Sequence, residues 1–315
     1  MKNFTVLATP RSFDSADSKA TQLLESKGCT VIKIPTLNMR ENLLKYVDQA
    51  DAIIAGLETY DKEMLEKFPK LKVISRYGVG YDAVDCAYAQ KKGITVTITP
   101  GANGNSVSDL AVTLMLAVSR NISYMDKTIK ENNYQRPIGQ ESWQKTVGVI
   151  GTGRIGSGVV RRCAGFDMKV LCMDVYKNQE IIDKYGAEYT TFDDLLKRSD
   201  YISIHTPLTP ETESMFGTAQ FKLMKKNAII VNTARGGIIN EDDLYEALKN
   251  NDIWGAGLDV TREGIPYTGK LKELDNCILT PHAGAATYES SSKMSYMAAE
   301  NVLSILEGKD CKFSV

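Results

Sequence analysis

Short apolar runs alternate with amphipathic segments along most of this chain. In the first hundred residues, the apolar runs that predict strands lie at residues 4–8, 31–34, 52–55, 73–75 and 94–98. Segments with helical spacing separate several of them, for example residues 18–27 and 62–68. Strands that alternate with helices are typical of a parallel sheet covered on both faces. The first part of the chain therefore predicts a small, doubly wound parallel sheet.

The same alternation starts again at Val147. The second series of predicted strands lies at residues 147–150, 170–173, 201–204, 228–232, 256–259 and 277–280. Helical segments separate these runs, which predicts a second and larger parallel sheet with helices on both faces.

Two longer helices are expected to connect the sheets. Ser106 and Asp109 have the spacing of a capping box, and the apolar run 110–118 behind them predicts a buried helix. Residues 285–307 predict a long helix that stops at Gly308, and the tail 309–315 is expected to return to the first sheet. We therefore expect one domain to comprise residues 1–101 and 286–315, and the other residues 102–285.

Composition excludes several classes of protein. The 315 residues carry 38 basic and 39 acidic side chains, interspersed, so no basic stripe indicates a nucleic-acid partner. No apolar stretch has the length of a signal peptide or a membrane span, which predicts a soluble, cytoplasmic protein that does not contact a membrane. The six cysteines lack CxxC spacing, so we expect buried reduced thiols, no disulfide and no metal site.

A glycine-rich turn follows the first strand of the second series. Gly151, Gly153 and Gly156 have GxGxxG spacing, with an apolar run before them and a helical segment behind. The first glycine permits a tight turn, the second lets the backbone approach a pyrophosphate, and the third lets the helix pack against the strand. In this context the motif predicts a dinucleotide site, in which the helix N-terminus binds the phosphates.

An acidic residue closes the next predicted strand. Asp174 can accept hydrogen bonds from both ribose hydroxyls of NAD and would repel the additional phosphate of NADP. We therefore predict NAD as the cofactor, although Lys177 leaves one cation nearby.

Further candidate site residues stand at the ends of the later strands. Ligands of doubly wound sheets bind outside the carboxyl ends of the strands, so these groups are expected to meet at one edge. They are His205, Thr206 and Pro207; Thr233, Ala234 and Arg235; Asp259; and His282 with Gly284.

Taken in order, these motifs resemble the D-2-hydroxyacid dehydrogenase family, and its phosphoglycerate dehydrogenase-like branch in particular. The matching segments cover nearly the whole chain and are residues 76–82 with 84–85, 99–103, 151–156, 232–237, 257–260 and 280–284. The resemblance implies a flavodoxin-like substrate domain and a Rossmann NAD-binding domain with a cleft between them. It also implies a homodimer formed through the nucleotide domain, with the helix from Ser106 at the contact.

The resemblance assigns roles to individual residues. His282 matches the general acid and base, Arg235 the binder of the substrate carboxylate, and Asp259 the acceptor from the nicotinamide carboxamide. The positions that match substrate contacts are Arg76, Tyr77 and the backbone N–H groups of Val79 and Gly80. The positions that match the cofactor lining include Arg154, Ile155, His205, Thr206, Pro207, Thr233, Ala234 and Gly284. Without the family match, a lone histidine after a strand is more often structural, and Arg235 would be a surface cation.

The chain departs from the family pattern at the acidic partner of the histidine. The family glutamate stands five positions after the aspartate matched by Asp259, where this chain has Gly264. Glu263 comes one position earlier, so either Glu263 orients His282 from a shorter loop or the partner is missing. We expect Glu263 to be the partner; the alternative is a solvated loop glutamate beside Arg262.

The substrate is the least determined property. Loops around Arg11, residues 57–59 and Arg76 are expected to set it, and the two arginines suit a phosphate or a second carboxylate. We therefore place 3-phosphoglycerate and phosphohydroxypyruvate first. Glycerate and hydroxypyruvate, or glyoxylate, are the alternatives, and a non-catalytic NADH-sensing protein is the alternative of another class.

Overall fold

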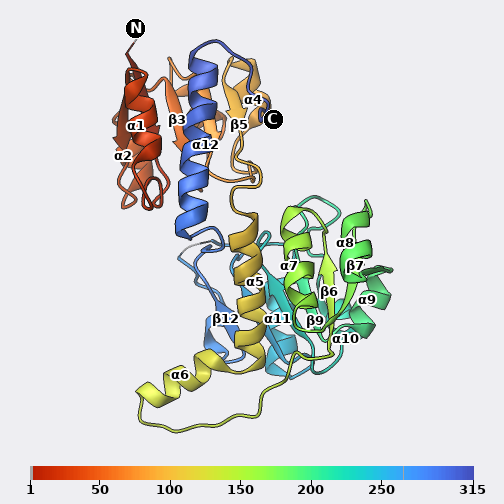
Figure 1. The fold of residues 1–315 in the computed structure, drawn as a ribbon. Coiled ribbons are helices and arrows are strands. Elements are labelled where there is room, and N and C mark those ends of the chain that lie inside the picture. The colour runs from red at the N-terminus through yellow and green to blue at the C-terminus, as the bar shows by residue number, and fades with distance from the viewer. Residues whose placement is uncertain (1–2, 265) are drawn as a thin grey trace. The chain divides into compact units, whose positions relative to one another are not determined.

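A computed structural model describes residues 3–264 and 266–315 of the chain. The chain divides into two compact units, Met1–Asn103 with Ala285–Val315, and Gly104–Gly284. The boundaries expected from the sequence fall at 101/102 and 285/286. Each unit is a parallel sheet with helices on both faces (Figure 1), so the predicted fold class is confirmed.

The first unit contains a five-stranded sheet with the order β2-β1-β3-β4-β5, in which every pairing is parallel. The strands are β1 (Phe4–Ala8), β2 (Cys29–Lys33), β3 (Ala52–Ala55), β4 (Val73–Arg76) and β5 (Thr95–Thr97). The helices are α1 (Lys19–Ser26), α2 (Met39–Leu44), α3 (Lys62–Glu66), α4 (Cys86–Lys91) and α12 (Tyr288–Leu306). This strand order reverses direction between β1 and β3, as it does in flavodoxin-like sheets.

Alternating side chains of these strands build two cores. Val6, Ala52 and Ile54 pack with residues of α1 and α12, whereas Leu7 and Ile53 pack with residues of α3 and α4. The C-terminal tail pairs with β5, since the N–H of Ile98 donates to Phe313 and that of Val315 to Val96. The predicted return of the tail to the first sheet is therefore confirmed.

The second unit contains a seven-stranded parallel sheet with the order β12-β11-β10-β9-β6-β7-β8. Its strands are β6 (Thr146–Ile150), β7 (Lys169–Met173), β8 (Glu188–Tyr189), β9 (Tyr201–Ile204), β10 (Ile229–Asn232), β11 (Gly255–Leu258) and β12 (Cys277–Leu279). Its helices are α5 (Gly104–Ser119), α6 (Ile122–Lys130), α7 (Arg154–Ala164), α8 (Gln179–Tyr185), α9 (Phe192–Arg198), α10 (Thr218–Leu223), α11 (Glu241–Lys249) and the 3₁₀ helix η1 (Lys270–Glu273). The sequence predicted six of the seven strands and missed β8.

Helix α5 begins earlier than its sequence suggested. The expected cap at Ser106 is wrong, because α5 starts at Gly104 and Ser106 lies within its first turn. One face of α5 packs against the sheet through Ala111, Leu114 and Met115, so it belongs to the core of its own unit.

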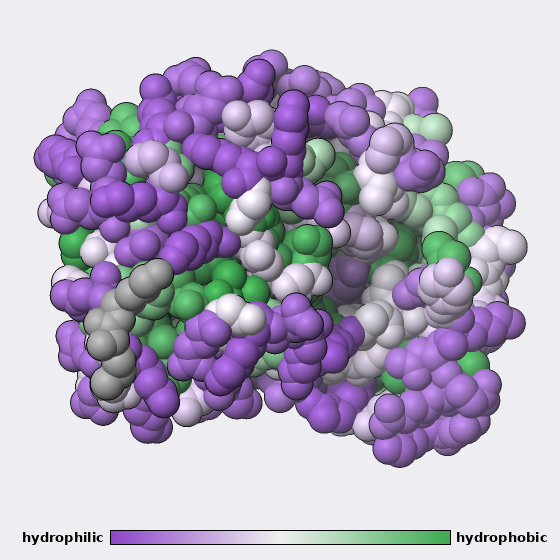
Figure 2. All heavy atoms as spheres, turned by 90° about the horizontal axis from the view of Figure 1, so that it is seen from above, coloured by the Kyte–Doolittle hydropathy of each residue, from purple (hydrophilic) through white to green (hydrophobic). Residues whose placement is uncertain are grey.

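Most of the surface in view in Figure 2 is hydrophilic. Within the described residues, no helix combines the length and the apolar character that crossing a membrane requires. All six cysteines are free thiols, and Cys29, Cys163 and Cys172 are buried.

Candidate active site

The sheet of the second unit reverses its strand order beside β6. Strands β7 and β8 lie on one side of β6, and β9 to β12 lie on the other. Because all strands are parallel, the residues that follow them share one edge, and ligands of such sheets bind at the point of reversal. The predicted cofactor residues follow the three strands at this point. The glycine turn follows β6, Asp174 follows β7 and His205 follows β9.

The glycine turn is packed too tightly for side chains at two positions. A Cβ on Gly151, which has φ +85°, would lie 2.7 Å from the carbonyl of His205. A Cβ on Gly156 would lie 1.9 Å from the oxygen of Gly151. In contrast, nothing lies within 4 Å of a Cβ built on Gly153, the N-cap of α7. The turn therefore leaves open space where the free N–H groups of a helix N-terminus can bind phosphate.

Asp174 is held by the glycine turn. Its Oδ2 accepts hydrogen bonds from the N–H of Thr152 and, at 3.0 Å, from the Thr152 hydroxyl. Burial alone would raise the pKa of Asp174, but the N–H groups of Thr152 and Tyr176 outweigh it and lower this pKa. The residue therefore presents a carboxylate, not a carboxylic acid, at the edge of the sheet.

A tyrosine on β8 fixes this arrangement. The Tyr189 hydroxyl lies 2.7 Å from the Thr152 hydroxyl and accepts a hydrogen bond from the N–H of Asn178 at 2.8 Å. The side-chain amide of Asn178 also donates to the Ser157 hydroxyl in α7 at 3.0 Å. We call Thr152, Asn178 and Tyr189 the Tyr189 network. This network joins the glycine turn to the loop that carries Asp174.

Two buried polar atoms at the same edge have no hydrogen-bond partner within the described part of the chain. They are Nδ1 of His205 and Oγ1 of Thr233, which follow β9 and β10. Burial lowers the pKa of His205 to about 3, so its imidazole is neutral, and its Nε2 lies 2.8 Å from the Ser203 hydroxyl. Buried polar groups are normally satisfied, so these atoms, the open glycine turn and the Asp174 carboxylate fit a bound dinucleotide.

The other predicted cofactor residues lie around this edge. Arg154 is exposed in the first turn of α7, and the carbonyl of Ile155 accepts a hydrogen bond from Ser108. Thr206 is half-buried, and the carbonyl of Pro207 accepts from Thr212. The N–H of Ala234 is bound by the Asn232 side chain at 2.9 Å.

Asp259 fastens the turn that carries His282. One carboxylate oxygen accepts from the Thr280 hydroxyl at 2.6 Å and from the N–H of Ala283 at 2.7 Å. The other oxygen accepts from the N–H of Gly284 at 2.8 Å. The Asp259 carbonyl binds the N–H of His282, which has φ 52°. Since Asp259 is only 2% exposed, these contacts fix from within the protein the backbone of the turn that carries the exposed His282.

Arg235 is positioned from the neighbouring strand β10. The Asn232 amide donates to the Arg235 carbonyl at 2.8 Å, and the guanidinium donates to the Ala234 carbonyl at 2.7 Å. The next residue, Gly236, packs directly on the backbone of Thr261, where a Cβ would lie 2.1 Å from it. The ends of β10, β11 and β12 therefore carry Arg235, Asp259 and His282 on adjacent strands.

Glu263 lies in the exposed loop after β11. Its Oε2 accepts hydrogen bonds from the N–H of Thr268 at 3.2 Å and from the Thr268 hydroxyl at 2.6 Å. These bonds lower the pKa of Glu263, so the side chain is a carboxylate at neutral pH. The pairing of Glu263 with His282 stays a prediction.

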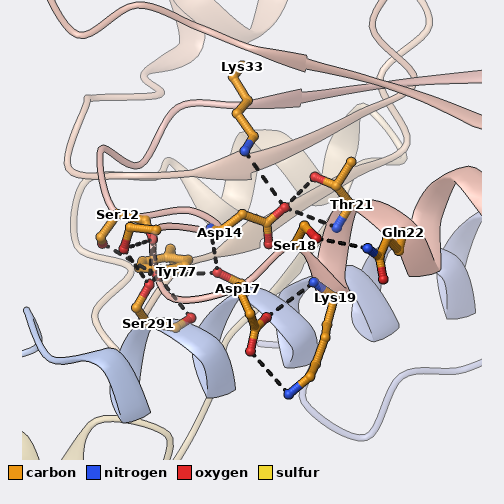
Figure 3. A network of polar contacts seen from close by, with 12 residues as sticks. Ser12, Asp14, Asp17, Ser18, Lys19, Thr21, Gln22, Lys33, Tyr77 and Ser291 are labelled. Carbon is orange, nitrogen blue, oxygen red and sulfur yellow. Dashed lines mark hydrogen bonds and ion pairs between the residues drawn. The ribbon is translucent and has the colours of Figure 1, made fainter.

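The predicted substrate residues lie at the corresponding edge of the first unit. Arg76, 5% exposed, donates to the carbonyls of Gly80 and Ala55, each at 3.0 Å. It thereby shapes the segment that contains Val79 and Gly80. The Tyr77 hydroxyl donates to the carbonyl of Ser12 at 3.0 Å and contacts Ser291 of α12 (Figure 3). Arg76 and Tyr77 thus fix the backbone of the loops that sequence reasoning assigned to the substrate.

This edge-of-sheet arrangement is that of a dinucleotide-binding dehydrogenase domain, and comparison with known proteins identifies its family. The model of the family described as "D-isomer specific 2-hydroxyacid dehydrogenase, NAD binding domain" matches residues 112–284. The chain belongs to this family and is an NAD-dependent 2-hydroxyacid dehydrogenase. The predicted family, enzyme class and cofactor are confirmed.

Individual relatives cover most of the chain. A glyoxylate reductase of Thermococcus litoralis is 40% identical over 88% of this chain and 87% of its own length. A D-3-phosphoglycerate dehydrogenase of Methanocaldococcus jannaschii is 41% identical over 94% of this chain, which spans 57% of that protein. The structure of a D-lactate dehydrogenase from Aquifex aeolicus, complexed with NAD and lactic acid, superposes with a TM-score of 0.81 at 32% identity, covering 96% of each chain.

Sequence reasoning missed the Tyr189 network. β8 has two residues, too few for a visible apolar pattern, and Thr152 stands at a variable position of the glycine motif. Replacing Tyr189 by Phe leaves the N–H of Asn178 and the hydroxyl of Thr152 without this partner. We expect NADH to bind the free enzyme about three- to tenfold more weakly, the equivalent of one lost hydrogen bond.

Titration of NADH fluorescence on the free enzyme measures this effect. The control is Tyr185→Phe in α8, which removes a phenol hydroxyl outside the network. Equal dissociation constants for the two variants would show that the network does not position Asp174.

Proposed function

We propose that this enzyme reduces a small 2-oxo acid with NADH and that His282 donates the proton to the carbonyl oxygen. The observation that carries the proposal is the turn that Asp259 holds. This turn places the exposed His282 behind β12, and only β11 lies between β12 and the strand β10 that precedes Arg235. When bound, NADH supplies the hydride. His282 is neutral after the proton has left and takes it back in the reverse reaction.

Arg235 is proposed to bind the substrate carboxylate, together with the backbone N–H groups of Val79 and Gly80. The planar guanidinium offers two parallel donors to a carboxylate, which also orients the adjacent carbonyl. Asp259 is proposed to accept from the nicotinamide carboxamide in addition to holding its own loop, as the family resemblance implies. Gly284 and the residues that follow β9 and β10 complete the proposed cofactor contacts.

Two kinds of oxo acid are candidates for the substrate. The sequence placed phosphohydroxypyruvate first, and one relative is a D-3-phosphoglycerate dehydrogenase. Two other relatives, 40% and 38% identical, are glyoxylate reductases, which supports glyoxylate or hydroxypyruvate. The assignment of the first unit as the substrate domain and a cytoplasmic location also remain proposals.

Loss of NADH absorbance with phosphohydroxypyruvate, hydroxypyruvate, glyoxylate, pyruvate and phenylpyruvate tests the reaction. We expect turnover of at least one of them, and we expect His282→Asn to lower kcat about 10²–10⁴-fold while NADH binding is kept. Tight NADH binding without turnover of any oxo acid would contradict the proposal and favour the sensor.

Glu263 is proposed to orient His282 and to stabilise its protonated form. A nearby carboxylate raises the pKa of an imidazole, so we expect Glu263→Gln to lower the pKa of His282. Reduction requires the protonated imidazole, and activity is lost as pH rises through its pKa. The alkaline limb of the kcat/KM profile should therefore move to lower pH. Glu273→Gln in η1 is the control, and an unchanged limb in Glu263→Gln would remove Glu263 from the site.

A homodimer through the nucleotide-binding unit is also proposed, with the helix from Ser106 at the contact. We propose that α6 and the segment behind it, which extend away from the sheet of their unit in Figure 1, enlarge this contact. Their exposed apolar side chains are Ile122, Ile129, Tyr134, Ile138 and Trp143. Light scattering at assay concentration should give twice the mass of the chain, and a single-chain mass would contradict the dimer.

A further inference from the structure

The sheet of the first unit has its own point of reversal, and a glutamate occupies it. The strand order changes direction between β1 and β3, and ligands of doubly wound sheets bind outside the carboxyl ends at such a point. Thr9 follows β1 and Gly56 follows β3. The side chain of Glu58, two residues further on, turns back between these two strand ends.

Three donors converge on one oxygen of Glu58. Its Oε1 accepts from the Tyr60 hydroxyl at 2.8 Å, from the Thr9 hydroxyl, and at 2.9 Å from the N–H of Gly56, which also donates to the Thr9 hydroxyl oxygen at 2.8 Å. Thr9 is 1% exposed and Tyr60 is fully buried. Burial raises the pKa of Tyr60, and the neighbouring Glu58 raises it further, so the phenol keeps its proton and remains a donor. The Glu58 carboxylate is thus rigidly held and satisfied by groups suited to binding an anion.

This carboxylate lies next to the segment proposed to bind the substrate. The carbonyl of Ala55, directly before Gly56, accepts from the N–H of Tyr77 and from the Arg76 guanidinium, each at 3.0 Å. Arg76 also holds the carbonyl of Gly80. The end of β3 and the loop of Val79 and Gly80 are therefore joined through one side chain.

From this geometry we infer that Glu58 is a specificity-determining residue that rejects substrates with a second anionic group. The inference rests on the proposed function, in which the substrate carboxylate is held at this edge. A phosphate or a second carboxylate on the distal carbon of the substrate would meet the negative charge of Glu58. It would not reach the three donors, because these already bind Glu58. The preferred substrate is therefore a 2-oxo acid with an uncharged distal group, such as hydroxypyruvate, and not phosphohydroxypyruvate.

Steady-state kinetics with these two oxo acids tests the inference. We expect kcat/KM of the unaltered enzyme for hydroxypyruvate to exceed that for phosphohydroxypyruvate by about tenfold or more. Glu58→Gln keeps an acceptor for the three donors but removes the charge, and Glu58→Ala also frees the donors. Both variants should lower the ratio of kcat/KM for hydroxypyruvate to kcat/KM for phosphohydroxypyruvate about tenfold. The control is Glu63→Gln in α3, whose side chain is 72% exposed and which should leave the ratio unchanged.

Binding gives a second measurement that does not require turnover. Calorimetry on the enzyme saturated with NADH, which cannot react with a 2-hydroxy acid, compares the binding of glycerate with that of 3-phosphoglycerate. We expect glycerate to bind more tightly, and we expect Glu58→Gln to lose this preference. Preference for the phosphorylated compound, or an unchanged ratio in a folded Glu58→Gln, would overturn the inference. Failure to reduce any oxo acid would instead contradict the proposed function, and the binding ratio would still decide the role of Glu58.

Discussion

The chemistry proposed for this enzyme depends on the three hydrogen bonds that the Asp259 carboxylate accepts from the turn behind β12. A turn between a strand and the next segment has few internal contacts, and His282 adopts a left-handed backbone conformation within it. A buried carboxylate with both oxygens satisfied compensates for this strain and for its own desolvation. The proposed general acid, His282, is therefore held by backbone and carboxylate contacts to the ends of β11 and β12.

Most of the architecture could be predicted because its signals are local. Strands β1, β3 and β9 have the predicted limits, since buried parallel strands read as short continuous apolar runs. β8 was missed because a two-residue edge strand leaves no such run. The start of α5 was misplaced because Ser106 has the residue type of a cap, while the helix is fixed by packing against α7 and the sheet.

The candidate site was predictable where chain order implies spatial order. The carboxyl ends of parallel strands share one edge of the sheet. The sequence alone was therefore enough to group Gly151, Asp174, Arg235 and His282. Contacts between side chains distant in sequence could not be predicted. Tyr189 with Thr152, and Glu58 with Thr9, meet only after the sheets have formed, and neither pair belongs to a periodic pattern. The sequence shows that Arg76 has the residue type of an anion ligand, but not that its buried guanidinium also donates to the backbone carbonyls of Gly80 and Ala55.

The burial of His205 has a consequence for spectroscopy. The chain has two histidines, and burial lowers the pKa of His205, at the end of β9, to about 3. Across the range in which the enzyme would be assayed, a single imidazole can therefore change its charge. In the ¹⁵N or ¹H spectrum of the histidine rings, any resonance that moves with pH between about 5 and 9 belongs to His282 without further assignment. The His205 ring thus serves as an internal reference, because its signals stay fixed while those of His282 report on protonation at the end of β12.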